Sequence, residues 1–312
     1  MLVMLVGVLS VVRPSFASPQ NLRDLLVQAA PVMIVGCGMT LVVLTGEIDI
    51  SVGSLLGFLA ALLGVMSSPQ HLGLPSGVVV ALTLAAGTGV GLVNGLLVTV
   101  GRVPSIVATL GMLTVLRGIT HFVLGGDWVT DLPPSLRALG TGSFAGVPIC
   151  IWTGAAVAAV GIFVTRKTEL GLRLRAIGGN SAAAAIARVP VGRVKVLAFA
   201  ATGFLTAVAA LVCVTQQSVI ESGIGAGFEL TVITAVVVGG TSIQGGTGGI
   251  TGTLLAAVLL GSIRTALVFL NLGESASFWE RAIQGCFILV AVLADHYAAA
   301  NARKPRRVGV RV

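Results

Sequence analysis

The sequence predicts an all-α, polytopic membrane protein with about ten transmembrane helices, some of them short or broken at glycine-rich stretches, and one short cytoplasmic helix. Three observations lead to this fold class. Hydrophobic residues make up 55% of the 312 residues and charged residues only 10%, whereas soluble domains carry about 25% charged residues. Uncharged apolar runs recur along the chain, and a spanning helix needs about 20 such residues. Charge gathers instead in residues 165–195 and 298–312. We therefore expect a single transmembrane domain over residues 1–312.

The basic segment orients the chain. A single carboxylate, Glu169, stands there among basic side chains: Arg166, Lys167, Arg173, Arg175, Arg188, Arg193 and Lys195. Because positive charge favours the cytoplasmic side of a membrane, we place the loop 166–194 and the basic tail 298–312 in the cytoplasm. The net charge of +8 could indicate nucleic acid, but aromatic residues are only 5% of the chain. Anionic lipid at the membrane surface is the simpler partner for these loops.

Within this loop the sequence predicts a short helix. Asn180 or Ser181 can accept hydrogen bonds from the first-turn amides, and the run 182–187 is almost all alanine, the best helix former. Pro190 disfavours helical geometry at the residue before it, and glycines 178 and 179 are expected to let the chain bend. A second protein could push on such a helix, although a plain solvated loop is the commoner interpretation of this pattern alone.

The remaining spans follow from the uncharged runs. Residues 1–12 are apolar but too short to cross a bilayer, so we expect a first helix whose beginning is missing or mis-started. The other expected spans are 25–46, two between 50 and 101, 104–124, 148–165, 195–215, a short one at 229–239, 250–272 and 281–297, with an irregular connection at 125–148. Six crossings before the basic loop and four after it put both termini in the cytoplasm.

Glycine is concentrated in two regions. One span carries Gly87, Gly89, Gly91 and Gly95, and small residues of this kind let helices approach closely, so we expect this span to be buried against neighbours. Further glycines break the apolar run at 239–249. Irregular backbone at membrane depth is tolerated only where it is buried in protein or lines a cavity.

Enzyme chemistry has no support in the sequence. No G-x-x-x-x-G-K-[ST] phosphate loop and no nucleophile motif occurs. The four cysteines and three histidines show no metal-ligand spacing, and we expect Cys37, Cys150, Cys213 and Cys286 to be small buried apolar residues. The sequence therefore predicts no metal site, no cofactor and no enzyme activity.

Polar residues inside apolar runs are the remaining site candidates, because charge and hydrogen-bonding groups at membrane depth are expensive and usually functional. We take as candidates for a translocation pathway Asp49, Ser51, Asn94, Thr109, Glu229, Thr241 and Ser242. Caps at helix starts explain several of them equally well. Arg117 lies inside a span and is expected to pair with a carboxylate or to reach an interface.

Several motifs together resemble a known family. These are TGEIDISVGS at 45–54, VNG at 93–95, TLGMLTVLRGI at 109–119, TELGLRLRAIGGNSAAAA at 168–185 and GFELTVITAVVVGGTSIQGGTGGITGT at 227–253. In this order they resemble the permease subunits of ribose-type bacterial ABC importers, within the branched-chain amino acid and sugar permease superfamily. The resemblance covers about residues 21–297. The chain departs from the family pattern at Glu47, where a glycine is usual, and at Thr231, where an acidic residue is usual.

The resemblance implies a ten-helix subunit of the bacterial inner membrane that pairs with a second permease subunit, either a copy or a paralogue. Its partners would be cytoplasmic ATPase subunits, which hold the ATP and Mg, and a periplasmic sugar-binding protein. The solute would be a monosaccharide or small polyol, including molecules like autoinducer-2. Coupling to the ATPase would fall on Ala176, Ile177, Gly178, Gly179, Asn180, Ala183, Ala184 and Arg188.

Two other transporter classes stay open at this point. One is a branched-chain amino acid permease of the same superfamily. The other is a proton-coupled carrier in which Glu47, Asp49 and Glu229 relay protons.

Overall fold

The computed structural model describes residue 16, residues 18–269 and residues 276–302. Its helices are α2 (Pro19–Leu44), α3 (Val52–Ser67), α4 (Ser76–Thr99), α5 (Ser105–Leu124), α6 (Pro134–Thr141), α7 (Ile149–Lys167), α8 (Glu169–Gly179), α9 (Ser181–Ile186), α10 (Val191–Cys213), the 3-10 turn η2 (Val214–Gln216), α11 (Phe228–Val238), α12 (Ile250–Phe269) and α13 (Ala276–Ala302). A small antiparallel hairpin joins β1 (Ser143–Phe144) to β2 (Val147–Pro148).

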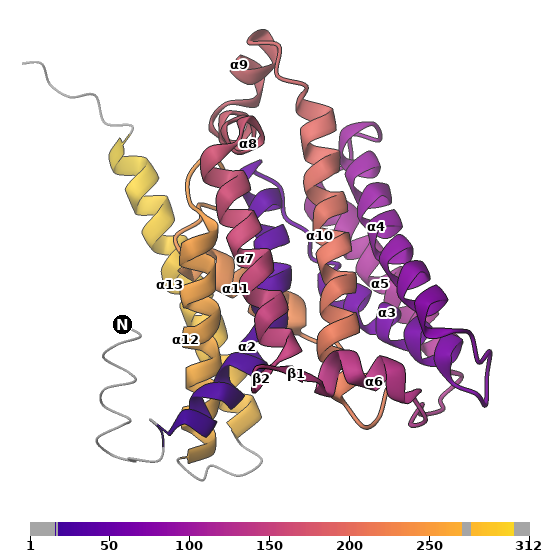
Figure 1. Cartoon of the computed structure of the whole chain (residues 1–312). Helices are drawn as coiled ribbons and strands as arrows, with labels where there is room; N and C mark the ends of the chain where they lie inside the picture. The colour runs from indigo at the N-terminus through magenta and orange to yellow at the C-terminus, as the bar shows by residue number, and fades with distance from the viewer. Residues whose placement is uncertain (1–15, 17, 270–275, 303–312) are drawn as a thin grey trace, which may run out of the picture.

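The long helices form a bundle around α2 and α10, with α8 and α9 at one end (Figure 1). α10 packs against α2 and α4, while α2 also packs against α7 and α12. Most of α2 and α10 is buried, whereas α4, α5 and α7 expose large apolar side chains such as Val107, Phe122 and Phe163. A bundle with an apolar core and an apolar exterior is suited to a lipid environment.

The prediction of an all-α, polytopic membrane protein is confirmed. In the described part of the chain, six helices are long and apolar enough to cross a membrane, and α3 and α11 are shorter apolar helices. α13 covers the predicted span 281–297 and continues to Ala302. The predicted first crossing at 1–12 and the tail residues 303–312 lie outside the described residues.

The glycine stripe of α4 packs directly on the backbone of α10. A Cβ added at Gly95 would lie 2.8 Å from Val196 Cα, and one at Gly91 would lie 3.0 Å from Ala200 Cα. Gly87 is equally close to α10, but a Cβ at Gly89 would meet nothing within 4 Å. Glycines four residues apart share one helix face, so the predicted close approach is confirmed for that face, while Gly89 points away from it.

Two local predictions were wrong. The connection at 125–148 is not irregular throughout, because it contains α6 and the hairpin. Gly178 and Gly179 do not bend the chain, because both lie in the last turn of α8.

Within the described residues Arg117 forms no ion pair with a carboxylate, so that predicted pairing was wrong. Its Nη1 donates hydrogen bonds to the carbonyls of Ser222, at 2.9 Å, and Ile224, at 3.0 Å. A guanidinium can satisfy the free carbonyls of a non-helical segment as well as it satisfies an acid, so its partners could not be read from charge alone.

The cysteines differ in exposure. Cys37 and Cys150 are buried, as predicted, whereas Cys213 is partly exposed and Cys286 is exposed. Cys213 still packs against the hydrophobic core, whereas Cys286 lies on a face of α13 that the rest of the described chain leaves uncovered.

Candidate functional site

The short helix predicted in the basic loop is α9. Asn180 Oδ1 accepts a hydrogen bond from the amide of Ala183 at 3.0 Å, so the predicted N-cap is present. The helix ends after Ile186, and Arg188 adopts a left-handed φ of 60° as the Val189 amide bonds back to the Ala184 carbonyl at 3.0 Å. Local sequence therefore defines both ends of α9.

A small apolar cluster ties α8 and α9 to the bundle. Ile177 in α8 and Ala184 in α9 are buried and pack with Leu44 at the end of α2 and Val194 at the start of α10. On the outer side, Ile186 is 86% exposed.

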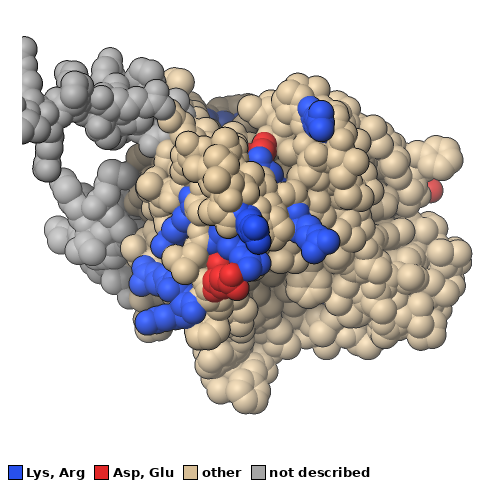
Figure 2. All heavy atoms as spheres, turned by 90° about the horizontal axis from the view of Figure 1, so that it is seen from above, with Lys and Arg blue, Asp and Glu red and all other residues tan. Residues whose placement is uncertain are grey.

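The end of the bundle that carries α8 and α9 is strongly basic (Figure 2). Some of its charges are paired: Arg173 bonds Glu169 at 2.5 Å, and Lys195 forms an ion pair with Glu47. Arg166 donates to the Thr251 hydroxyl at 3.0 Å. The remaining unpaired cations give this face a net positive charge.

Glycines join α8 to the rest of the bundle at what we call the glycine junction: Gly46, Gly178, Gly245 and Gly246. The Gly246 amide donates to the Leu44 carbonyl at 3.0 Å. A Cβ added at Gly245 would lie 2.6 Å from Gly46 N and 2.9 Å from Gly178 Cα, and one at Gly178 would overlap Leu44 O and Gly246 N. Three chain segments therefore meet here backbone to backbone, which leaves no room for a side chain.

A buried polar cluster of Asp49, Ser51, Asn94 and Thr109 begins three residues after Gly46 of the junction. The amide and hydroxyl of Ser51 donate to Asp49 Oδ1 at 2.9 and 2.6 Å, and Asn94 Nδ2 donates to Ser51 Oγ at 2.9 Å. Thr109 Oγ1 accepts from the Ile50 amide at 3.1 Å. All four side chains are at most 1% exposed in the isolated chain. The cluster thus fixes the segment between α2 and α3 to α4 and α5.

Residues 21–292 match the model of a protein family described as branched-chain amino acid transport system / permease component. The chain belongs to this family. It is 37% identical to the ribose import permease protein RbsC of Haemophilus influenzae, over 95% of this chain and 91% of the relative. It is 34% identical to the L-arabinose ABC transporter permease protein AraH of Azospirillum brasilense, over 97% and 88% of the two chains. It is 37% identical to the autoinducer 2 import system permease protein LsrC of Klebsiella pneumoniae, over 98% and 87%.

These matches confirm the resemblance to ribose-type permeases. No solved structure matches the chain. The chain is a family member, and its described residues include six helices long and apolar enough to cross a membrane, so it is a multi-pass membrane protein.

The seven pathway candidates do not gather at one place in the permease. Four form the buried polar cluster. Glu229, in the first turn of α11, packs its carboxylate on Gly53 in the first turn of α3, and its Oε2 is buried without a hydrogen-bond partner. Thr241 and Ser242 lie in the glycine loop 239–249, where Thr241 packs against Gly248. They therefore belong to the loop whose Gly245 and Gly246 contact Gly178 of α8.

The coupling candidates divide by position. Ala176 to Gly179 form the end of α8, Asn180 caps α9, Ala183 and Ala184 lie in α9, and Arg188 follows it. Ile177 and Ala184 face inward, and Ala183 and Arg188 face outward.

Sequence reasoning missed Ile186, the Lys195–Glu47 pair and the role of Gly46. Ile186 could have been found from the sequence, because it is a large apolar residue at the end of a predicted alanine helix in a basic loop. The departure at Glu47 was visible too, but nothing in the sequence indicated that its partner lies 148 positions away.

Proposed function

We propose that this chain is the permease subunit of an ATP-binding-cassette importer that carries a monosaccharide or small polyol from a periplasmic binding protein into the cytoplasm. The observation that carries the proposal is α9: a capped helix that projects from the basic end of the bundle with an exposed Ile186 and is fixed to the core by Ile177 and Ala184. This is the form expected of a lever on which another subunit acts.

In this proposal, α9 is connected mechanically to the buried polar cluster. ATP binding would close the ATPase subunits and move α9. The movement would pass through α8 and the glycine junction to Gly46, which is three residues from Asp49, and through Lys195 to Glu47. Because backbone-to-backbone contacts and a partly buried ion pair do not yield easily, they would transmit a displacement instead of absorbing it. The cavity would thereby change from periplasm-facing to cytoplasm-facing.

The solute class rests on the relatives, which are named for ribose, L-arabinose and autoinducer 2. All three are small polar molecules. Neutral hydroxyl and amide groups, such as Thr241 Oγ1 and Asn94 Oδ1, suit their recognition, and both of these atoms are buried without a hydrogen-bond partner in the isolated chain. They could bind solute only when the chain moves or pairs with a second subunit.

The wider assembly belongs to the same proposal. The permease would lie in the bacterial inner membrane with ten crossings and both termini in the cytoplasm. It would pair with a second permease subunit, either a copy or a paralogue. The exposed apolar faces of α4 and α5 offer one surface for that contact or for lipid. This chain would bind no cofactor, since ATP and Mg would sit on the ATPase subunits.

The test is reconstitution in proteoliposomes with the ATPase subunits and the sugar-binding protein encoded with this gene. Uptake of labelled ribose, arabinose or autoinducer-2 should require ATP on the side of the membrane where the ATPase subunits are bound. It should persist when an uncoupler collapses the proton gradient. An ATPase subunit that binds but does not hydrolyse ATP is the control. Uptake that continues without ATPase subunits, or that the uncoupler abolishes, would favour the proton-coupled carrier. Uptake of leucine or valine in place of sugars would favour the branched-chain amino acid permease.

A further inference from the structure

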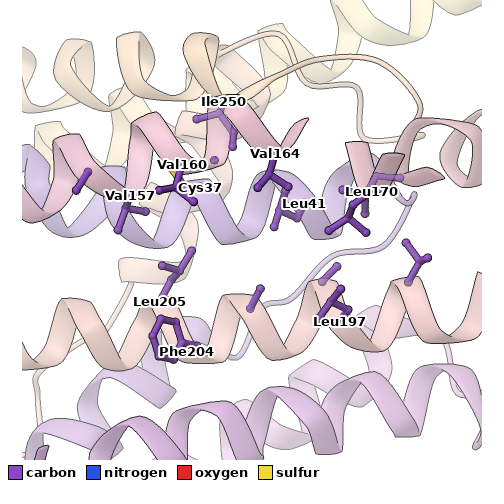
Figure 3. Close-up of a pocket in the computed structure, with 16 residues that line it drawn as sticks. Cys37, Leu41, Val157, Val160, Val164, Leu170, Leu197, Phe204, Leu205 and Ile250 are labelled. Atoms are coloured by element: carbon purple, nitrogen blue, oxygen red, sulfur yellow. The ribbon is translucent and has the colours of Figure 1, made fainter. Parts of the chain in front are cut away.

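The first turn of α12 is held against α7. Ile250, the first residue of α12, is 2% exposed and lines an apolar groove together with Val160 and Val164 of α7 (Figure 3). A Cβ added at Gly161 of α7 would lie 2.6 Å from the end of the Ile250 side chain. Apolar contacts therefore fix the start of α12 beside α7.

Two arginines bracket this helix start. Arg166, in the last turn of α7, donates from Nη2 to the Thr251 hydroxyl at 3.0 Å. Arg175, in α8, donates from Nη2 to the carbonyl oxygen of Gly248 at 3.4 Å, and Gly248 is two residues before α12. The two guanidinium groups therefore approach residues 248–251 from two different helices.

This arrangement lacks negative charge. The N-terminus of a helix carries a partial positive charge, so an acid is favourable there and a cation is unfavourable. The first turn of α12 contains no acidic residue, and within the described part of the chain neither Arg166 nor Arg175 forms an ion pair. Glu169, the acid nearest to Arg166 in the sequence, is bonded to Arg173. An anion would offset the repulsion among the two guanidinium groups and the helix dipole.

Two buried groups next to Gly248 can donate a hydrogen bond and have no acceptor. Thr241 is 1% exposed, and its Oγ1 has no partner among the described residues. A Cβ built on Gly248 would lie 2.6 Å from that oxygen. Nε of Arg175 is also buried without a partner. A Cβ added at Gly249 would meet nothing within 4 Å, so the position next to the helix start is open.

We propose that the start of α12 binds a phosphoryl group, held by Arg166, Arg175 and the first amides of the helix, with the Thr241 hydroxyl beside it. The groups without partners here are donors, and the first helical amides have no acceptor within the helix. Such a set repels a cation and favours an oxyanion. The donors come from α7, α8 and the end of α12, so a tetrahedral anion can satisfy more of them than a planar carboxylate can.

The test is phosphate binding to the purified full-length chain in a neutral detergent at low salt, which needs neither ATPase subunits nor sugar. Labelled inorganic phosphate should bind at one saturable site in equilibrium dialysis. Sulfate, which is also tetrahedral, should displace it, and acetate at the same concentration should not. Arg166→Gln and Arg175→Gln should each weaken phosphate binding about tenfold, because each removes charge-assisted hydrogen bonds. Arg193→Gln removes a cation that lines a different groove, between α4 and α10, and should leave binding unchanged.

Thermal unfolding distinguishes a lost site from a misfolded chain. Phosphate should raise the unfolding temperature of the unchanged chain and of Arg193→Gln, because a ligand that binds only the folded state stabilises it. It should not raise the unfolding temperature of the double variant Arg166→Gln, Arg175→Gln. Thr241→Val keeps the shape of the side chain but removes its hydroxyl, and should weaken phosphate binding about threefold.

Two kinds of vesicle identify the source of the phosphoryl group. If a membrane lipid supplies it, replacing part of the phosphatidylcholine in proteoliposomes by phosphatidic acid should displace labelled phosphate. If a soluble phosphate supplies it, labelled phosphate should bind equally in both vesicles. The proposal is overturned if Arg193→Gln weakens binding as much as Arg166→Gln does, or if acetate displaces phosphate as well as sulfate does. Either result would mean that the whole basic face attracts anions without a defined site.

Discussion

Lys195, in the first turn of α10, forms an ion pair with Glu47, which lies 148 positions earlier in the segment between α2 and α3. Both side chains are only 17% exposed. The pair connects the helix that follows the basic loop to the segment that carries Asp49 and Ser51. In the function proposed above, a movement of the loop would reach the buried polar cluster through this ion pair as well as through the glycine junction.

Breaking this pair should lower coupled transport. Lys195→Met or Glu47→Gln leaves one partly buried group without its partner, at a cost of about 1 to 3 kcal/mol. We expect sugar uptake per ATP hydrolysed to fall several-fold in each single variant and to recover partly in the double variant, where no charge is left unpaired. The comparison is Glu169→Gln, which breaks the exposed Arg173 pair and should change uptake little. If Glu169→Gln lowers uptake per ATP hydrolysed as much as Lys195→Met does, the Lys195–Glu47 pair has no special role in coupling.

Gly178 and its neighbour Gly179 should respond oppositely to the same substitution. Gly178→Ala places a methyl group on Leu44 O and Gly246 N, so we expect destabilisation of about 1 to 3 kcal/mol. Gly179→Ala meets nothing within 4 Å and should be neutral or slightly stabilising, because alanine favours helix. Thermal unfolding in detergent measures both. A stable Gly178→Ala variant would mean that the junction can open without loss.

Asn180→Ala should weaken the association with the ATPase subunits. It removes the cap of a six-residue helix, which costs about 1 kcal/mol, and a helix this short has little stability of its own. We expect about fivefold weaker binding of the ATPase in a pull-down titration. Asn180→Ser retains a capping oxygen and should bind nearly as well as the unchanged chain; if the two variants bind alike, the cap is not what orders α9.

Ile186→Asp should disrupt the same association without affecting the fold. The side chain is 86% exposed, so a charge there has no folded contact to break, but it would be buried in a docked complex. Leu72→Asp, at an exposed leucine between α3 and α4 on the opposite end of the bundle, is the matched control. Co-purification with the ATPase should be lost only for Ile186→Asp.

Thr109→Val tests whether the buried polar cluster is structural in the resting chain. The substitution keeps the shape of the side chain but leaves the Ile50 amide without its acceptor, so unfolding should become easier by about 1 to 3 kcal/mol. Thr114→Val, on an exposed face of the same helix, should be nearly neutral. If stability is unchanged while transport falls, Thr109 acts on the solute instead.

Local features of the sequence predicted much of the fold. Composition and uncharged runs defined the membrane class, because a bilayer requires long apolar helices whatever their partners. The ends of α9 followed from Asn180 and the alanine run, since capping and helix propensity act within a few residues. The four-residue spacing of Gly87, Gly91 and Gly95 predicted a closely packed face for the same reason.

Only the tertiary structure decided which distant groups meet. It placed Lys195 on Glu47, Arg117 on the carbonyls of Ser222 and Ile224, and Thr241 on Gly248. Hydrogen bonds and ion pairs between remote positions depend on how helices pack, and apolar helices of this kind have little in their sequences to specify a partner. The sequence by itself determined that the chain crosses a membrane and carries a capped helix in its basic loop; packing determined how that helix reaches the buried polar groups.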